Sequence, residues 1–393
     1  MNLPFALPVP QRGEKLSDEQ AMCLAISEAY KGSLYAAPNP LVGAVVLDKE
    51  NRFLSSGYHE KYGGPHAEVN AFKGLTEKDL EGARVYVTLE PCAHEGKTPS
   101  CAKMMAKHKL SHVMVGLVDP NPLVAGQGLE ILRNAGIAVS LYEELKTAQT
   151  ETLEELEQVC EVFLFNYRKK MTFVALKVAT SLDGQMALRD GESKWITGEA
   201  SRHHVHYLRA SYDAIMVGKG TVQFDNPSLN IRRSDIDKIN KVVVLDSKGE
   251  LLKNIENLNI FKSHSLENIY WCLSEDQSAQ EETLKKIGIN ILFCRTKNGS
   301  LDLTHVLELL FQNKVYSVFI EGGARLASEA LNCGIVNRLY LFQAPIIMGA
   351  GGSQSWTETI TLGSMQDRIS LNSPKLMTFG NDVMITGVFK KTR

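Results

Sequence analysis

The chain has 393 residues, which is the length of two or three folding units and excludes a mini-protein. Its 43 Lys and Arg nearly balance 45 Asp and Glu, and the net charge of -2 provides no overall field for a polyanion such as DNA. Hydrophobic residues make up 44% and charged residues 22%, as in soluble globular proteins, and no apolar stretch is long enough to span a bilayer.

The first 15 residues predict a flexible leader, because they contain three prolines and lack the basic and apolar segments of a signal peptide. We therefore expect the protein in the cytoplasm. A capping box formed by Ser17 and Gln20 predicts the first helix, and short β-branched runs then alternate with helical patterns. In this half the expected helices open at Ser17, His66, near Ser100 and at Leu129, and the expected strands cover 41–47, 85–89, 113–118 and 137–140.

A domain boundary is predicted after a Glu-rich helical segment that ends in the basic run of residues 168–170. We expect a leader of residues 1–15, one domain over 16–165 and a second over 166–393. Alternating strands and helices resume beyond the boundary, which predicts an α/β fold with a mostly parallel sheet in each domain and chemistry at the strand ends. The expected strands here cover 173–179, 214–217, 242–245, 269–272, 291–294, 317–320 and 339–344, and the expected helices cover 201–210, a segment from 304, and 325–331.

The most specific signal is one histidine and two cysteines, His66, Cys92 and Cys101, at junctions of strands or loops with helices. An imidazole and two thiolates suit one Zn²⁺ ion, and three protein ligands leave the fourth tetrahedral position for water, as in catalytic sites. Zinc lowers the pKa of bound water to about 7, and Glu68 is placed to relay its proton to a leaving amine. The pattern predicts hydrolytic deamination with Glu68 as the catalytic residue.

The spacing of the two cysteines leaves alternatives open. Eight residues separate Cys92 from Cys101, where the zinc deaminase signature has two, and this spacer contains His94. In one alternative His94 closes a structural zinc site and Glu68 is a solvated surface charge. In two others the chain is a nucleoside or nucleic-acid base deaminase, or a zinc-stabilised binding module without turnover.

Several spaced motifs of the first 150 residues are similar to the deaminase half of the bifunctional riboflavin biosynthesis family. They are the segment 38–43, the His-Ala-Glu motif, the block 88–98 and the segment 119–128. The resemblance implies a cytidine-deaminase-like three-layer domain that binds a phosphorylated aminopyrimidine through Asn39, His59, His94 and Lys97, with Lys97 near the phosphate. Ser100 stands where the family usually has proline, a change that we expect to be silent.

Two features of the second half indicate phosphate binding on their own, although each is weak in isolation. The segment 319–326 predicts a strand that enters a helix through Gly322 and Gly323, and the amides of such a helix start favour a pyrophosphate. The guanidinium groups of Arg209 and Arg232 suit phosphate oxygens. Taken alone, the same residues are better explained by a tight turn and two solvated charges.

Motifs at 173–184, 193–197 and 208–229 are similar to the reductase half of the same family, which implies a dihydrofolate-reductase-like domain that uses NADPH. The resemblance implies that the substrate is contacted by Ser193, Arg209, Leu229, Arg232 and Glu321. It implies that NADPH is contacted by Ala179, Trp195, Thr221, Asp225, Ser247, Gly323, Ala324, Arg325, Leu326, Ala327, Ser328 and Glu329. Lys177 and Asp225 are candidates for the proton donor.

The other histidines and cysteines that could bind a metal are not expected to do so. Only His203 and His206 of the His203, His204 and His206 cluster share a helix face, so we predict no metal there. Of the other cysteines we expect burial as small hydrophobic residues; these are Cys23, Cys160, Cys272, Cys294 and Cys333. The expected partners are a small phosphorylated pyrimidine and further copies of the chain, as a dimer or tetramer, without nucleic acid or membrane.

Overall fold

The computed structural model describes residues 7–94, 99–121, 125–188, 190–349 and 353–389. The chain divides into two compact units, Met1–Lys169 and Lys170–Arg393. The division falls at the end of helix α7 (Glu161–Lys169), so the boundary expected after residue 165 lies inside this helix. Arg168 and Lys169 form the last turn of α7, where positive side chains interact favourably with the helix dipole. The first two residues of the basic run therefore end the first unit, and Lys170 begins the second.

The first unit contains a five-stranded sheet in the order β2-β1-β3-β4-β5. Strand β1 (Gly43–Leu47) is antiparallel to β2 (Phe53–Tyr58) and β3 (Arg84–Leu89), whereas β3, β4 (His112–Leu117) and β5 (Ala138–Leu141) are parallel. The four predicted strands are present. Strand β2 was not predicted, because its centre, Ser55-Ser56-Gly57, has low β propensity.

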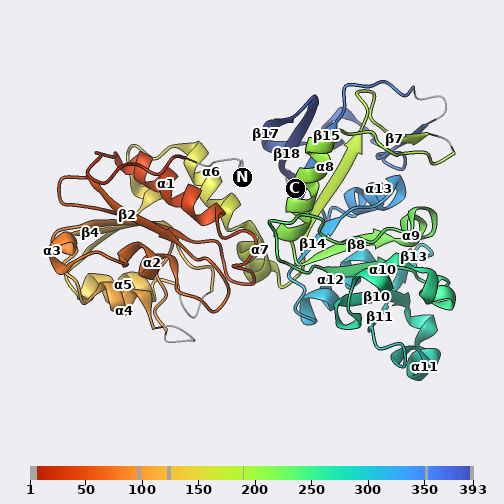
Figure 1. The fold of residues 1–393 in the computed structure, drawn as a ribbon, viewed down its shortest axis with the longest axis horizontal. Helices are drawn as coiled ribbons and strands as arrows, with labels where there is room; N and C mark the ends of the chain where they lie inside the picture. Colours follow the sequence, from red (N-terminus) through yellow and green to blue (C-terminus); the bar gives the residue numbers. More distant parts are fainter. Residues whose placement is uncertain (1–6, 95–98, 122–124, 189, 350–352, 390–393) are drawn as a thin grey trace. The chain divides into compact units, whose positions relative to one another are not determined.

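Two layers of helices cover the sheet of the first unit (Figure 1), and the side chains of β1 alternate between them. Val45 and Leu47 pack with α1 (Asp18–Tyr30), α6 (Thr150–Val159) and α7 on one face. Ala44 and Val46 pack on the opposite face. The helices of that face are α2 (Ala67–Phe72), α3 (Glu77–Leu80), α4 (Cys101–Met105) and α5 (Gln127–Asn134), and a 3-10 turn, η1 (Tyr142–Glu144), follows β5.

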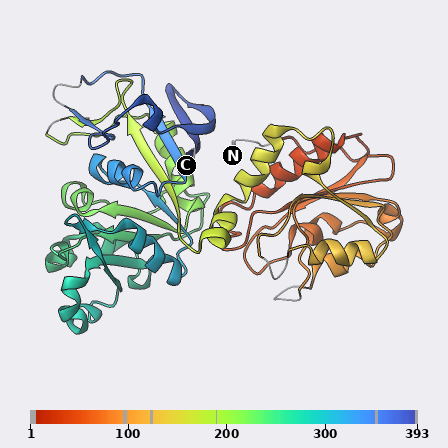
Figure 2. The ribbon, with the colours of Figure 1, turned by 180° about the vertical axis from the view of Figure 1, so that it is seen from behind.

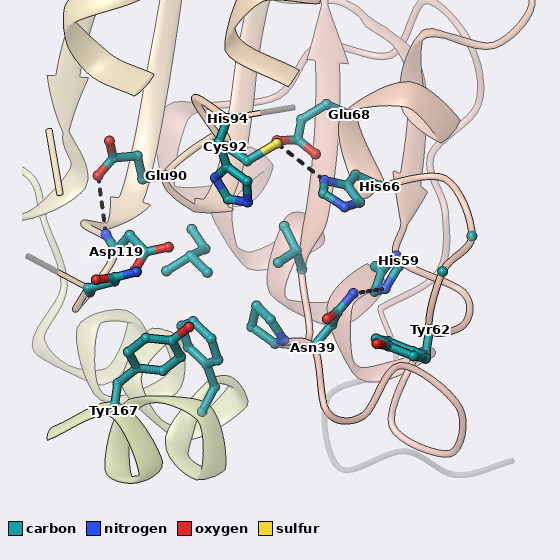
Figure 3. Close-up of a pocket in the computed structure, with 17 residues that line it drawn as sticks. Asn39, His59, Tyr62, His66, Glu68, Glu90, Cys92, His94, Asp119 and Tyr167 are labelled. Atoms are coloured by element: carbon teal, nitrogen blue, oxygen red, sulfur yellow. Dashed lines mark hydrogen bonds between the residues drawn. The ribbon is translucent and has the colours of Figure 1, made fainter. Parts of the chain in front are cut away.

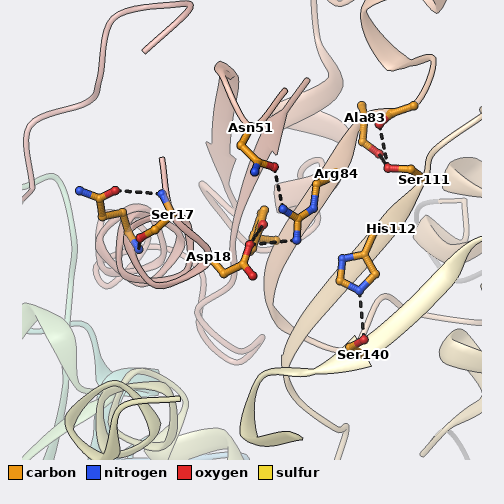
Figure 4. Close-up of polar contacts among 11 residues, drawn as sticks. Ser17, Asp18, Asn51, Ala83, Arg84, Ser111, His112 and Ser140 are labelled. Carbon is orange, nitrogen blue, oxygen red and sulfur yellow. Dashed lines mark hydrogen bonds and ion pairs between the residues drawn. The ribbon is translucent and has the colours of Figure 1, made fainter. Parts of the chain in front are cut away.

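A polar cluster fastens helix α1 to the amino end of β3 (Figure 4). Arg84 forms an ion pair with Asp18 at 2.9 Å and donates a hydrogen bond to Asn51 at 2.6 Å. The hydroxyl of Tyr86 donates to Asp18 at 2.5 Å. These contacts lie at the amino end of β3. Functional loops of parallel sheets follow the opposite, carboxyl ends of the strands, here those of β3 and β4.

The second unit contains a nine-stranded sheet in the order β11-β10-β9-β8-β14-β6-β15-β18-β17. Seven of its strands are parallel and correspond to the predicted ones: β6 (Phe173–Thr180), β8 (Ala214–Gly218), β9 (Lys241–Leu245), β10 (Ile269–Ser274), β11 (Asn290–Cys294), β14 (Ser317–Ile320) and β15 (Arg338–Gln343). The hairpin of β17 (Leu371–Phe379) and β18 (Asp382–Phe389), which was not predicted, adds an antiparallel edge.

Helices cover both faces of this sheet (Figure 2). α12 (Leu303–Gln312) and α13 (Ala324–Asn332) pack on the face that presents Val174, Leu176 and Val178. The opposite face carries α8 (Glu199–Ser211), α9 (Lys219–Asp225) and α10 (Asn259–Ser263). The smaller elements are β7 (Gln185–Leu188) with β16 (Ser353–Ser355), β12 (Thr296–Lys297) with β13 (Ser300–Leu301), α11 (Glu281–Lys285), and the 3-10 turns η2 (Leu251–Asn257), η3 (Leu266–Asn268), η4 (Glu275–Gln280) and η6 (Met365–Asp367).

In the described part of the chain, no helix has both the length and the apolar character that crossing a membrane requires.

Candidate active sites

The structure brings the three predicted zinc ligands together. The donor atoms of His66, Cys92 and Cys101 all lie within 4.8 Å of one another. His66 caps the amino end of α2, Cys92 follows β3, and Cys101 begins α4. The Nδ1 atom of His66 lies 3.5 Å from the Cys92 sulfur and 3.3 Å from the Cys101 sulfur. One imidazole nitrogen and two sulfurs that converge in this way fit a zinc ion.

Two hydrogen bonds to Cys92 tie together the ends of the cysteine spacer. The backbone N–H of Cys101 donates to the Cys92 sulfur at 3.3 Å. The hydroxyl of Ser100 donates to the Cys92 carbonyl at 2.7 Å and accepts a hydrogen bond from the Lys103 backbone N–H at 3.2 Å. The Ser100 hydroxyl therefore links the two ligand segments.

Replacing Ser100 with alanine is expected to weaken zinc retention about tenfold, because residues that orient metal ligands typically contribute about 10–100-fold in affinity. Ser100 is only 1% exposed, so its two hydrogen bonds would be lost away from water, and only the bond from the Ala102 backbone N–H, at 3.1 Å, would still hold the Cys92 carbonyl. The measurement is the zinc content that remains after competition with a graded series of chelator concentrations. Ser100→Thr, which keeps the hydroxyl, is the control and should retain zinc like the natural protein.

Glu68 is buried beside the predicted zinc ligands. It lies in the first turn of α2 and is 3% exposed, so it is not the solvated charge of the alternative interpretation. Burial raises the pKa of its carboxyl group, while the positive charge of His66 opposes that shift. A carboxyl group with a raised pKa beside a metal site is suited to accept and return a proton.

A cavity of ≈ 340 Å³ opens beside this cluster, and most of the predicted pyrimidine contacts line it (Figure 3). Asn39 donates through Nδ2 to His59 Nε2 at 3.0 Å, and His59 Nδ1 donates to the Pro65 carbonyl at 2.9 Å. His59 is therefore neutral in this arrangement, and burial lowers its pKa. His94 also lines the cavity and is not among the clustered ligands, whereas Lys97 lies outside the described residues.

Sequence reasoning missed several cavity residues. Asp119 and Asn121 belong to a motif that was noted without a role, and Tyr62, Phe163 and Tyr167 were not singled out. Burial raises the pKa of Asp119, and its carboxylate accepts a hydrogen bond from the Asn121 backbone. The two residues of α7 could not be found from sequence, because they read as an ordinary amphipathic helix.

Glu90, which also lines the cavity, anchors the loop that contains Asp119. Its buried carboxylate accepts backbone N–H bonds from Asp119 at 3.2 Å, Gly126 at 3.0 Å and Gly128 at 2.9 Å. A Cβ atom at Gly128 would lie 2.0 Å from the Pro91 carbonyl oxygen, so this close approach requires glycine. The strand end that supplies Cys92 thus also fixes the opposite rim of the cavity.

In the second unit, a buried ion pair joins two of the predicted substrate residues. Arg209 donates to both carboxylate oxygens of Glu321, at 2.5 Å and 2.8 Å, and to the Asn230 carbonyl at 3.0 Å. Burial alone would raise the pKa of Glu321, but Arg209 outweighs it and the pKa is lowered. Burial lowers the pKa of the nearby Lys177, and Glu321 opposes that shift.

Other predicted substrate residues differ in how closely they approach this pair. Arg232 is exposed, and its backbone N–H donates to His206 Nδ1 at 3.2 Å. Burial, followed by Arg209 and Arg232, lowers the pKa of His206 to about 4. Leu229 is buried, whereas Ser193 is exposed in the segment that precedes α8.

The predicted NADPH residues gather mainly at the carboxyl ends of four adjacent strands, β9, β8, β14 and β6. Ala179 lies at the end of β6, Thr221 and Asp225 lie on α9 after β8, and Ser247 follows β9. Gly323 caps α13, whose first residues are Ala324, Arg325, Leu326, Ala327, Ser328 and Glu329, and a Cβ atom at Gly323 would lie 4.0 Å from the Thr221 hydroxyl.

This edge fits a dinucleotide. The amides at the start of the nine-residue helix α13 follow a glycine turn, which suits a pyrophosphate. The buried hydroxyl of Thr180, next to Ala179, has no hydrogen-bond partner among the described residues, as expected where a ligand supplies one. Trp195 is 70% exposed before α8, with the Arg202 guanidinium 4.4 Å from its ring centroid.

The remaining cysteines correct one expectation. Cys160, Cys272 and Cys294 are buried, but Cys23 is half-buried and Cys333 is exposed. Cys333 caps the carboxyl end of α13, where the helix meets solvent. The expected burial of Cys333, which rested on its apolar neighbours in the sequence, is wrong.

The fold and the two groups of residues define a two-unit enzyme, a zinc deaminase of the cytidine deaminase type joined to an NADPH-dependent reductase. Residues 15–117 match the cytidine and deoxycytidylate deaminase zinc-binding region, and residues 172–385 match the RibD C-terminal domain. The chain belongs to the RibD family of bifunctional riboflavin biosynthesis enzymes, and its second unit has the dihydrofolate-reductase-like fold. The expected fold class, the two enzyme activities and the two cofactors are confirmed.

Similarity to relatives extends over most of the chain. It is 36% identical to riboflavin biosynthesis protein RibD of Actinobacillus pleuropneumoniae, over 97% of this chain and 98% of the relative. Among solved structures, RibD of Acinetobacter baumannii superimposes with a TM-score of 0.80 at 33% identity, over 95% of this chain and 99% of that one. A deaminase/reductase of Thermotoga maritima superimposes with a TM-score of 0.78 at 32% identity, over 94% and 97%.

Proposed function

We propose that the first unit removes an exocyclic amine from 2,5-diamino-6-ribosylamino-4(3H)-pyrimidinone 5′-phosphate, and that the second unit reduces the ribosyl group of the product to ribityl. The similar Thermotoga maritima protein is a diaminohydroxyphosphoribosylaminopyrimidine deaminase and a phosphoribosylaminouracil reductase, which supports both steps. The observation that carries the proposal is the buried Glu68 beside His66, Cys92 and Cys101 at the wall of a cavity.

In the deamination step, His66, Cys92 and Cys101 would hold the zinc ion. Zinc supplies activation of a water molecule for attack on the ring carbon. Glu68 accepts a proton from the attacking water and returns a proton to the amine nitrogen, so that the C–N bond breaks and ammonia leaves. We propose that Asn39, His59 and His94 hold the pyrimidine and that Lys97 binds its phosphate.

In the reduction step, NADPH supplies a hydride to the open-chain sugar imine. The residues at the carboxyl ends of β9, β8, β14 and β6 would position the cofactor. Arg209, Arg232, Glu321, Ser193 and Leu229 would hold the substrate. The half-buried position of Lys177 near the charges of Glu321 and Arg209 supports it as the proton donor.

The ribotide itself provides the direct test of both steps. Without NADPH we expect ammonia release and no further change. With NADPH we expect the same ammonia release, followed by loss of one NADPH per ammonia, monitored by its absorbance. Oxidation of NADPH without ammonia release would contradict the proposed order.

Because the two active sites are separate, Cys92→Ser should lose one activity and keep the other. The variant should release no ammonia from the ribotide, because the zinc site loses a ligand, yet it should oxidise NADPH at the natural rate when given the deaminated ribotide. The deaminase ligands and the proposed reductase residues belong to different compact units. Loss of both activities would show that the units do not work independently.

We also propose that the protein is a homo-oligomer, a dimer or tetramer, in the cytoplasm. Strand β17 is an edge of the nine-stranded sheet, and Leu376 on it is 70% exposed, which supports pairing of this edge with another copy. All seven cysteines are free, as is usual in a reducing compartment. Light scattering during size-exclusion chromatography measures the oligomeric state.

A further inference from the structure

The cavity of the first unit has two chemically different sides. His66, Glu68 and Cys92 lie on one side, with His94 beside them (Figure 3). Phe163 and Tyr167 line another side, and both belong to helix α7. Figure 3 shows Tyr167 rising from α7 toward the cavity, opposite Cys92 and His94. A planar ring placed between the two sides would have an aromatic surface behind it and the catalytic groups in front.

The positions on α7 explain why these two rings act together. Residues four apart lie on one face of a helix, and the ring centroids of Phe163 and Tyr167 are 4.7 Å apart with an interplanar angle of 50°. Phe163 also packs against the core shared with α1 and α6, which fixes its position. Tyr167 is 38% exposed and stands nearer to solvent. The pair is a preformed surface with few rotatable bonds.

The aromatic surface lies outside the part of the chain that matches other zinc deaminases. The region shared with cytidine and deoxycytidylate deaminases covers residues 15–117, which include Glu68 and the three predicted zinc ligands. Helix α7 begins at Glu161, well outside that region. A wall supplied from outside the shared catalytic region is suited to distinguish one pyrimidine substrate from another.

We propose that Phe163 and Tyr167 are specificity-determining residues of the deaminase site and that the pyrimidine ring of the substrate lies against their aromatic surface. This inference rests on the proposed function of the first unit. Stacking of a base on an aromatic side chain contributes about 1–3 kcal/mol, which corresponds to about 5- to 150-fold in binding. The contact exists in the bound state and in the transition state alike, so its loss changes KM and leaves kcat nearly unchanged.

The test compares three variants of the full chain, with ammonia release from the ribotide as the assay. Tyr167→Leu should raise KM about 5- to 150-fold with kcat nearly unchanged, while Tyr167→Phe, which keeps the ring, should behave like the natural protein. Phe165→Leu is the matched control, because Phe165 lies on the same helix and is not among the residues that line the cavity. Zinc content should be unchanged in all three.

The outcomes separate this inference from the function on which it rests. If the natural protein releases no ammonia from the ribotide, the proposed function fails. If it does, and Tyr167→Leu has the natural KM or loses kcat alone, the aromatic wall is not a contact for the ring. Phe163→Leu is a second variant, and it should also raise KM. Thermal unfolding that matches that of the natural protein shows that this variant is folded.

Discussion

Glu68→Gln should abolish ammonia release from the pyrimidine ribotide while the protein keeps its zinc. The amide has nearly the shape of the carboxylate but cannot accept and return a proton, and general acid–base catalysis contributes about 10²- to 10⁴-fold to rate. Because Glu68 is buried and its pKa is raised, a neutral side chain of the same size is tolerated there. The predicted ligand atoms belong to His66, Cys92 and Cys101, so zinc binding does not depend on Glu68.

The measurement is ammonia produced per zinc-containing protein molecule, with zinc determined by elemental analysis. Glu60→Gln is the matched control, because Glu60 is exposed and should leave deamination unchanged. NADPH oxidation with the deaminated ribotide should be natural in both variants. Deamination by Glu68→Gln at a rate close to that of the natural protein would remove Glu68 from the mechanism.

The metal-ligand group could be predicted from sequence because its signal is local. His66, Cys92 and Cys101 each occur where an element begins or a strand has just ended, and parallel strands deliver such positions to one edge. The parallel strands were predictable for a similar reason, since buried β-branched runs such as Val242–Val244 stand out from their surroundings.

The rest of the deaminase cavity depends on tertiary packing, which local patterns do not specify. Phe163 and Tyr167 lie far from Glu68 in the sequence, and only the packing of α7 on the sheet brings them to the cavity. The role of Glu90 follows from three backbone amides of a distant loop. The β17–β18 hairpin was missed because exposed, polar residues such as Asn372 and Ser373 interrupt its apolar pattern.

The ion pair of the second unit makes Arg209→Met the substitution with the largest expected effect there. Removing one partner of a buried pair destabilises a protein by about 3–5 kcal/mol, because the other charge is left uncompensated. The side chains of Arg209 and Glu321 are only 13% and 12% exposed. Chemical denaturation should therefore show a large loss in the free energy of unfolding, with NADPH oxidation also lost.

The free energy of unfolding should depend on pH in opposite ways in the natural protein and in Arg209→Met. Arg209 lowers the pKa of Glu321, so the pair contributes stability above the pKa of an unfolded carboxyl group, and this contribution disappears as pH falls through the lower folded value. In Arg209→Met only the weaker effects of Lys177 and His206 still oppose burial, so the pKa of Glu321 rises. The variant should then gain stability as pH falls and Glu321 is protonated, opposite to the natural pair.

A double variant separates the structural role of the pair from its role in catalysis. Arg209→Met combined with Glu321→Gln removes both charges of the ion pair, so most of the lost stability should return at neutral pH. Reductase activity should not return, because neither the guanidinium nor the carboxylate is present to hold the phosphorylated substrate. If the double variant reduced the deaminated ribotide at the natural rate, the pair would serve folding alone and the substrate would have to be held by other residues, such as Arg232.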